Sequence, residues 1–90
     1  NDIKRAEEAV TNYVKTTINQ NQCDSLVCLV FNIGATNFKA STLLKFLNDG
    51  SLDKVPAQFM RWVYAGKVKL KGLENRRFAE VNLWNDKVLV

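Results

Sequence analysis

The stretch QNQCDSLVCLVFNIG, residues 20–34, is the richest in apolar side chains of this 90-residue chain. Asn19 precedes it as a residue type that caps helix N-termini, and Gly34 closes it as a residue type that follows helix C-termini. These capping residues favour a helix over a strand, despite the β-branched side chains. Because apolar side chains lie nearly all round this predicted helix, we expect it to be the buried, central helix of the fold.

Shorter helices are predicted on both sides of the central one. In residues 3–15, apolar side chains recur at three- and four-residue spacings, as in an amphipathic helix. Turn and capping residues predict further helices at residues 42–48, from about residue 55 through 63, and at residues 73–84, with a loop at 34–37. With 47% hydrophobic residues, the sequence predicts a single all-α domain over residues 1–90, with about five helices around one buried central helix.

The last predicted helix has an apolar face and two distinctive neighbours. Its inward side chains are expected to be Leu73, Phe78, Val81 and Trp84. Before it, GKVKLKG at residues 66–72 is expected to form a basic loop or a short extended piece. After it, residues 86–90 form an apolar tail with strand-like content and no partner that the sequence identifies.

The chain is basic, with a formal net charge of +4 and a pI near 9.3. Such a charge attracts anionic partners, which include nucleic acid, anionic lipid and bacterial wall polymers. Basic residues gather in one part of the sequence, either as a solvated face or as an anion-binding surface: Arg61, Lys67, Lys69, Lys71, Arg76 and Arg77.

The two cysteines do not predict a disulfide or a metal site. Cys23 and Cys28 lie in the central helix, where a separation of five residues puts their Cα atoms roughly 8 to 9 Å apart. That distance exceeds the reach of an unstrained disulfide. Because the chain has no His and no third Cys, we expect no zinc site. We expect both thiols to be small, buried or half-buried apolar groups, and we expect no cofactor.

Targeting signals are also missing from the sequence. No apolar run approaches the length that crosses a bilayer, since residues 26–33 form the richest one. The N-terminus, NDIKRAEEAV, is too polar for a secretory signal. Position 1 is Asn instead of Met, which is typical of a processed, trimmed or partial chain.

Four segments carry a resemblance to a known family: FNIG at 31–34, STLLKFLNDG at 41–50, QFMRWVYAG at 58–66 and GLENRRFAE at 72–80. In this order and at this spacing, they resemble the C-terminal lobe of phage-type lysozymes, the family 24 muramidases that phages use as endolysins. The resemblance covers roughly residues 10–84. It implies a lysozyme-like helical lobe, encoded by a phage and acting in the periplasm or on the cell wall of a bacterial host.

The resemblance implies that the family's catalytic Glu, with the Asp and Thr that follow it at fixed spacing, lies in an N-terminal lobe, and we expect these 90 residues not to include that lobe. Glu8 is followed nine residues later by Thr17, where the family has Asp, and Glu7 by Thr16. Both carboxylates are expected on the solvated side of an amphipathic helix. Without His, the usual Ser/His and Cys/His nucleophile systems cannot be built either. We therefore expect no catalytic residue in this chain.

The resemblance does imply a sugar-binding wall. In the family, the polar residue after the Phe of the FNIG-like segment faces the cleft, and here Asn32 follows Phe31. A lone amide in an apolar helix must also find hydrogen-bond partners, whether a ligand or internal backbone groups. Arg61 matches the Arg of the family's Arg-Trp pair near the cleft mouth, although a plain surface Arg is the alternative. Trp62 beside it is expected in the core. The predicted substrate-binding residues are Phe31, Asn32 and Arg61.

Arg76 and Arg77 match a run of arginines at the start of the family's last helix, whose first member is Asn75 here. In complete family members such arginines can pair with acidic groups of the N-terminal lobe. In this chain they are expected to be unpaired or recruited to a different partner, as possible interface or anion-binding residues.

Three functions are compatible with the sequence. The first is the peptidoglycan-contacting lobe of a lysozyme whose complete form cleaves the β-1,4 bond between N-acetylmuramic acid and N-acetylglucosamine; this lobe alone would bind glycan strands without hydrolysing them. The second is a regulatory or inhibitory protein derived from a lysozyme, which dimerises or binds another lysozyme through apolar surface around residues 3–14. The third, a cationic module for nucleic acid or membrane, is least favoured because the basic cluster has no interleaved aromatic platform.

Overall fold

The computed structural model describes residues 2–85. The helices are α1 (Asp2–Tyr13), α2 (Gln20–Ile33), α3 (Ala35–Lys39), α4 (Thr42–Asn48), the single 3-10 turn η1 (Leu52–Lys54), α5 (Val55–Phe59) and α6 (Lys71–Trp84). Strands β1 (Tyr64–Ala65) and β2 (Val68–Lys69) pair antiparallel in a short hairpin. The all-α prediction is confirmed, with six α-helices in the described residues where about five were expected. The predicted tail at 86–90 lies outside these residues.

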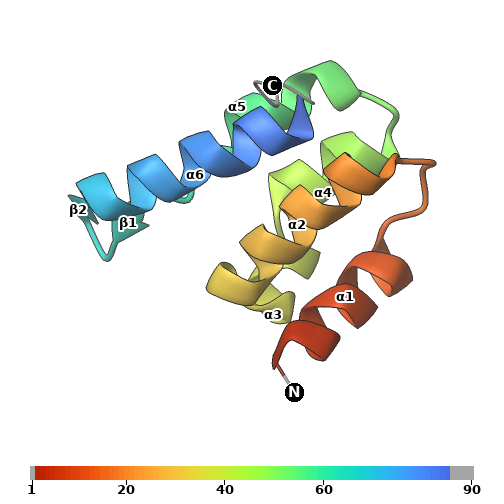
Figure 1. Cartoon of the computed structure of the whole chain (residues 1–90), viewed down its shortest axis with the longest axis horizontal. Helices are drawn as coiled ribbons and strands as arrows, with labels where there is room; N and C mark the ends of the chain where they lie inside the picture. Colours follow the sequence, from red (N-terminus) through yellow and green to blue (C-terminus); the bar gives the residue numbers. More distant parts are fainter. Residues whose placement is uncertain (1, 86–90) are drawn as a thin grey trace.

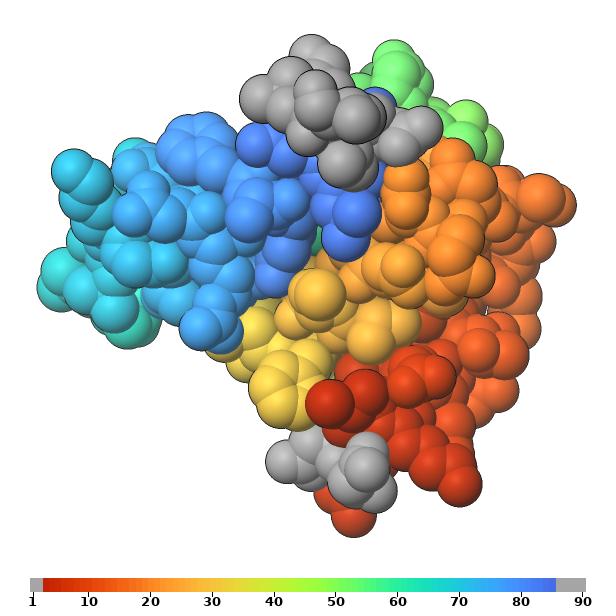
Figure 2. All heavy atoms as spheres, in the orientation of Figure 1, coloured from red at the N-terminus to blue at the C-terminus, as the bar shows by residue number. Residues whose placement is uncertain are grey.

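Helix α2 is central, as predicted. It lies between α1 and α6 and packs mainly against these two, while the β1–β2 hairpin lies at the N-terminal end of α6 (Figure 1). It is not buried all round, however, because Cys28, Phe31 and Asn32 are exposed. Figure 2 shows the C-terminal part of α2, in yellow, at the surface between the start of α1 and α6. The apolar side chains of Cys28 and Phe31 are therefore part of the protein surface.

The core joins α2 to every other α-helix. Its members include residues with almost no exposed area, namely Val10, Leu26, Leu29, Phe38, Leu43, Leu47, Val55 and Phe59. Trp84 of α6 reaches the same core, with its ring 6.0 Å from that of Phe59. Phe78 was predicted to face inward and does not, because its side chain is 50% exposed. The inward positions near it on α6 are taken by Arg77 and Glu80 instead.

The segment 34–37, predicted as a loop, begins helix α3. Gly34 has φ of +91°, a backbone conformation that favours glycine, and it turns the chain directly from α2 into α3. Phe38 of α3 is fully buried and fixes this short helix to the core. The side-chain amide of Asn37 donates to the carbonyl of Ile33, an acceptor left free at the end of α2.

Other boundaries moved by a few residues from their predicted positions. Helix α1 ends at Tyr13, and the segment after it is held by Asn48, which accepts from the backbone N–H of Lys15 and donates to the carbonyl of Tyr13. Helix α5 begins at Val55 as expected, but it ends at Phe59. The basic segment 66–72 contributes to the β1–β2 hairpin and to the first turn of α6.

The N-terminus of α2 offers a direct test of the capping argument. Asn19 Oδ1 accepts from the backbone N–H of Gln22 at 2.8 Å, and Gln22 Oε1 accepts from the backbone N–H of Asn19 at 2.9 Å. We expect Asn19→Ala to lower the free energy of unfolding by about 1 kcal/mol, since a cap of this kind is lost. Urea denaturation followed by circular dichroism measures it. Asn12→Ala, on the exposed side of α1, is the control, and equal losses in both variants would contradict the capping argument.

Candidate functional site

Arg77 lies at the centre of a buried polar cluster. Its side chain is 0% exposed. Nε donates to the carbonyl of Trp62 at 2.9 Å, Nη1 donates to the carboxylate of Glu80 at 2.5 Å, and Nη2 donates to Oδ1 of Asn32. The guanidinium thus joins α2, the segment after α5 and α6. Each of its three nitrogens donates to an acceptor, and the carboxylate of Glu80 balances its charge. A buried Arg requires both.

Of the two alternatives expected for Arg77, unpaired or recruited to a different partner, the structure shows it paired, with Glu80. Its carboxylate partner, Glu80, comes from the same helix three residues further on, a spacing at which helical side chains meet. Burial raises the pKa of the Glu80 carboxyl, while the positive charges of Arg77 and Arg76 act in the opposite direction. Glu80 was not among the predicted site residues, although the spacing of an Arg and a Glu three residues apart on one helix was a usable signal.

Asn32 is the surface end of this cluster. The residue is exposed, and its Oδ1 is held by Arg77. The prediction that this amide needs a partner is confirmed, and the internal partner is a guanidinium from α6 instead of backbone. Among residues 2–85, no group bonds to Nδ2 of Asn32, so its amino group is available at the surface.

Arg61 and Trp62 line a polar hollow of about 310 Å³ next to this cluster. The other lining residues come from α3, α4 and α5: Asn37, Ala40, Ser41, Thr42, Leu43 and Gln58. Arg61 is exposed and has no acidic partner among the described residues. Trp62 is half-buried and packs against the core, as expected, while its backbone carbonyl accepts from Arg77. Through Arg77, the structure connects this hollow to Asn32.

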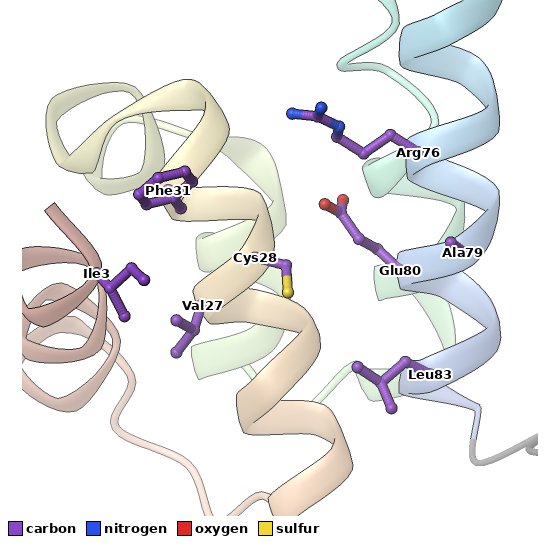
Figure 3. A pocket seen from close by; sticks show the side chains of 8 residues that line it. All are labelled: Ile3, Val27, Cys28, Phe31, Arg76, Ala79, Glu80 and Leu83. Carbon is purple, nitrogen blue, oxygen red and sulfur yellow. The ribbon is translucent and has the colours of Figure 1, made fainter.

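A second hollow lies between α1, α2 and α6. It has a volume of about 520 Å³ and is lined by Ile3, Val27, Cys28, Phe31, Arg76, Ala79, Glu80 and Leu83 (Figure 3). We call it the apolar groove. Phe31 lies here with Ile3 and Val27, and is not part of the polar hollow that Arg61 lines. The structure therefore separates Phe31 from Arg61. Asn32 lines neither of these two hollows, and Arg77 joins it to the backbone carbonyl of Trp62.

Arg76 lines the apolar groove from α6 and is exposed, whereas Arg77 beside it in sequence is buried. The predicted apolar surface of α1 is mostly covered, because Ala6, Ala9 and Val10 are buried. Only Ile3 of that stripe contributes to the groove.

A family model described as phage lysozyme matches residues 1–80, which include all four sequence segments that carried the resemblance. The chain belongs to the phage lysozyme family.

Two relatives and two solved structures define its place among phage lysozymes. The SAR-endolysin of Escherichia phage Mu is 40% identical over 84 residues, which are 93% of this chain and 49% of the relative. An endolysin of Acyrthosiphon pisum secondary endosymbiont phage 1 is 41% identical over 87 residues, covering 92% of this chain and 60% of the relative. The chain thus spans less than two thirds of each.

The chain also covers only part of each structural neighbour. The endolysin from Escherichia coli O157:H7 phage FAHEc1 superposes with a TM-score of 0.89 and 32% identity, over 99% of this chain and 59% of that one. The muramidase domain of SpmX from Asticaccaulis excentricus superposes with a TM-score of 0.86 and 34% identity, over 92% of this chain and 59% of that one. The fold of this phage lysozyme chain is therefore the lysozyme-like fold that the sequence indicated.

No group of His, Cys, Asp and Glu in the described part of the chain could hold a metal ion, and none of its helices is long and apolar enough to span a bilayer. Glu7 and Glu8 are exposed on α1. Glu80 is the single carboxylate that lines either hollow, and Arg77 binds it. Glycoside hydrolysis generally needs a pair of carboxyl groups across the scissile bond.

Both cysteines are free thiols, as predicted, but Cys28 is exposed in the apolar groove. Burial, Glu80 and Asp24 together raise the pKa of the Cys28 thiol above its usual value. Since the thiolate is the reactive form, we expect iodoacetamide to modify Cys28 at neutral pH several-fold more slowly than in the urea-unfolded chain. Mass spectrometry of labelled peptides measures both rates, and modification as fast as in the unfolded chain would contradict the raised pKa.

Proposed function

We propose that this chain is the C-terminal, peptidoglycan-contacting lobe of a phage lysozyme whose complete form hydrolyses the β-1,4 bond between N-acetylmuramic acid and N-acetylglucosamine. The observation that carries the proposal is the free amino group of Asn32, held at the surface by the buried Arg77. Arg77 also binds the backbone carbonyl of Trp62, a residue that lines the polar hollow with Arg61. Polar groups of this kind, with an aromatic side chain beside them, suit an uncharged sugar.

The same proposal assigns catalysis elsewhere. Glu7 and Glu8 are solvated, and Glu80 is paired with Arg77. None of these three residues therefore resembles a carboxylic acid poised beside a second carboxylate. The relatives, which bear the names endolysin and muramidase, are longer than this chain. We propose that the catalytic acid belongs to a companion lobe, and that this chain alone binds peptidoglycan without hydrolysing it.

Co-sedimentation with purified insoluble peptidoglycan, at low and high salt, tests this function. Asn32→Ala and Arg61→Ala are expected to weaken binding roughly 3- to 10-fold each, the effect of losing one hydrogen bond. The matched controls are Asn12→Ala and Arg5→Ala, at exposed positions of α1. Asn12→Ala removes an amide, as Asn32→Ala does, and Arg5→Ala removes a positive charge, as Arg61→Ala does. Circular dichroism confirms that each variant is folded.

Each outcome bears on a separate part of the proposal. Salt-resistant binding that only the two site variants lose supports the glycan-binding lobe. Binding that high salt abolishes, and that is equally strong in the parent and in all four variants, contradicts the glycan-binding lobe. Clearing of the suspension by the parent chain would contradict the assignment of the catalytic acid to a companion lobe.

The apolar groove favours a second candidate, a regulatory protein that associates with a second copy of this chain. Ile3 and Phe31 in the groove are 54% and 53% exposed, and contiguous exposed apolar side chains are typical of protein interfaces. Sedimentation equilibrium tests this function. A dimer that Phe31→Ser dissociates would favour it, and a monomer at all concentrations would favour the simple lobe.

A further inference from the structure

The contact between Arg77 and Asn32 determines which end of the Asn32 amide faces outward. A guanidinium carries only donors and stays charged at any ordinary pH. The reversed amide would place its two N–H donors against the N–H donors of Arg77, with no acceptor between them. Oδ1 must therefore face Arg77, and Nδ2 must face away from it.

The guanidinium is itself held in one orientation. Its Nε is bound to the carbonyl of Trp62 and its Nη1 to the carboxylate of Glu80, so two sides of the planar group have fixed partners. The side chain is fully buried. Side-chain rotation of Arg77 would break both contacts inside the protein, and the orientation of the Asn32 amide thus depends on α6 and on the segment after α5.

We propose that Arg77 is a positioning residue that presents the Asn32 side chain as a hydrogen-bond donor, so that the site selects an acceptor oxygen of the ligand. This inference rests on the proposed function and specifies its ligand chemistry. The acetamido carbonyl of an N-acetylated sugar supplies such an oxygen. A sugar from which the acetyl group has been removed carries an ammonium, which offers only donors to Nδ2.

Asn32→Asp separates the two roles of this residue. A carboxylate at this position still accepts from Arg77, so folding is maintained, but it can no longer donate to a ligand. We expect its affinity for tri-N-acetylchitotriose, measured by calorimetric titration, to fall roughly 10-fold, since a hydrogen-bonded ligand oxygen would face an acceptor. Its melting temperature should not fall. Asn12→Asp, on exposed α1, makes the same change in net charge and should bind as the parent does.

A second variant tests Arg77 without leaving a buried charge. In Arg77→Met with Glu80→Leu, apolar groups replace the whole pair, a change that often preserves folding. The Asn32 amide then loses its fixed orientation, and we expect affinity to fall roughly 3- to 10-fold. In amide correlation spectra, the side-chain NH₂ signals of Asn32 should shift with ligand in the parent and shift much less in this variant, a change that a purely structural Arg77 would not produce.

The outcomes distinguish this inference from the proposed function. The parent is expected to bind tri-N-acetylchitotriose and to bind chitosan trimer, its deacetylated form, at least roughly 10-fold more weakly. Parent-like affinity in Asn32→Asp, or in the folded double variant, would overturn the positioning role while leaving glycan binding intact. Failure of the parent to bind either trimer, together with failure to bind peptidoglycan, would overturn the proposed function and this inference with it.

Discussion

Arg77→Met is expected to lower the free energy of unfolding by about 3 to 5 kcal/mol, because it leaves the buried carboxylate of Glu80 without its partner. Glu80 is 5% exposed, so water compensates poorly for the lost guanidinium. Asn32 and the carbonyl of Trp62 lose a donor at the same time. Urea denaturation followed by tryptophan fluorescence measures the change, which is a large share of the roughly 5 to 15 kcal/mol that holds a typical domain folded.

Two controls isolate the cause. Arg76→Met removes an exposed Arg from the neighbouring position and should change stability by less than about 0.5 kcal/mol. Adding Glu80→Leu to Arg77→Met should recover most of the loss, because no buried charge then remains. A loss below about 1 kcal/mol in the single variant would be that of a surface pair and would contradict the buried cluster.

Phe38→Ala is expected to cost about 3 to 5 kcal/mol, the range for removing a fully buried aromatic side chain. Phe38 is 0% exposed and lies in the five-residue helix α3, which has few other buried groups. Phe78→Ala removes the same atoms from a half-exposed position on α6, where we expect a change within about 1 kcal/mol. Thermal denaturation of both variants gives the comparison. Equal losses would mean that Phe78 faces the core, as the sequence alone had predicted.

Local signals in the sequence identified the helices with strong caps. Helix α2 begins after Asn19 and ends before Gly34, where the capping residues placed it, and α4 follows Ser41 in the same way. These residues act on their own backbone, so their effect can be inferred without knowledge of the fold. Helix α3 has no such N-terminal cap, and it depends on the burial of Phe38, which only the folded chain provides.

The face of α6 could not be inferred from hydrophobic periodicity. That method places Phe78 inside and Arg77 outside, because it assigns burial by residue type. In the structure Arg77 and Glu80 are buried as a neutralising pair, and Phe78 takes the exposed position. Charged residues are buried when they are paired, and the acceptors that satisfy Arg77 come in part from α2, 45 residues away.

The candidate site was predicted in part. A lone amide in an apolar helix identified Asn32 as unusual, and the family resemblance pointed to Arg61. Neither could reveal that Arg77 binds both Asn32 and the backbone carbonyl of Trp62, the residue after Arg61, since that requires the packing of three separate segments. Phe31 and Asn32 are adjacent in sequence and lie about 100° apart around the axis of α2. That Phe31 lines the apolar groove while Asn32 meets Arg77 follows from how α1 and α6 pack on α2.

Chemical-shift mapping with soluble peptidoglycan strands tests the central claim most directly. The isotope-labelled chain is titrated with the strands, and their mass is measured before and after. We expect shifts concentrated at Asn32, Arg61 and Trp62, with the strands intact. Shifts confined to the basic hairpin or to the apolar groove, or shortened strands, would contradict the assignment of this chain as a glycan-binding lobe without its own catalytic acid.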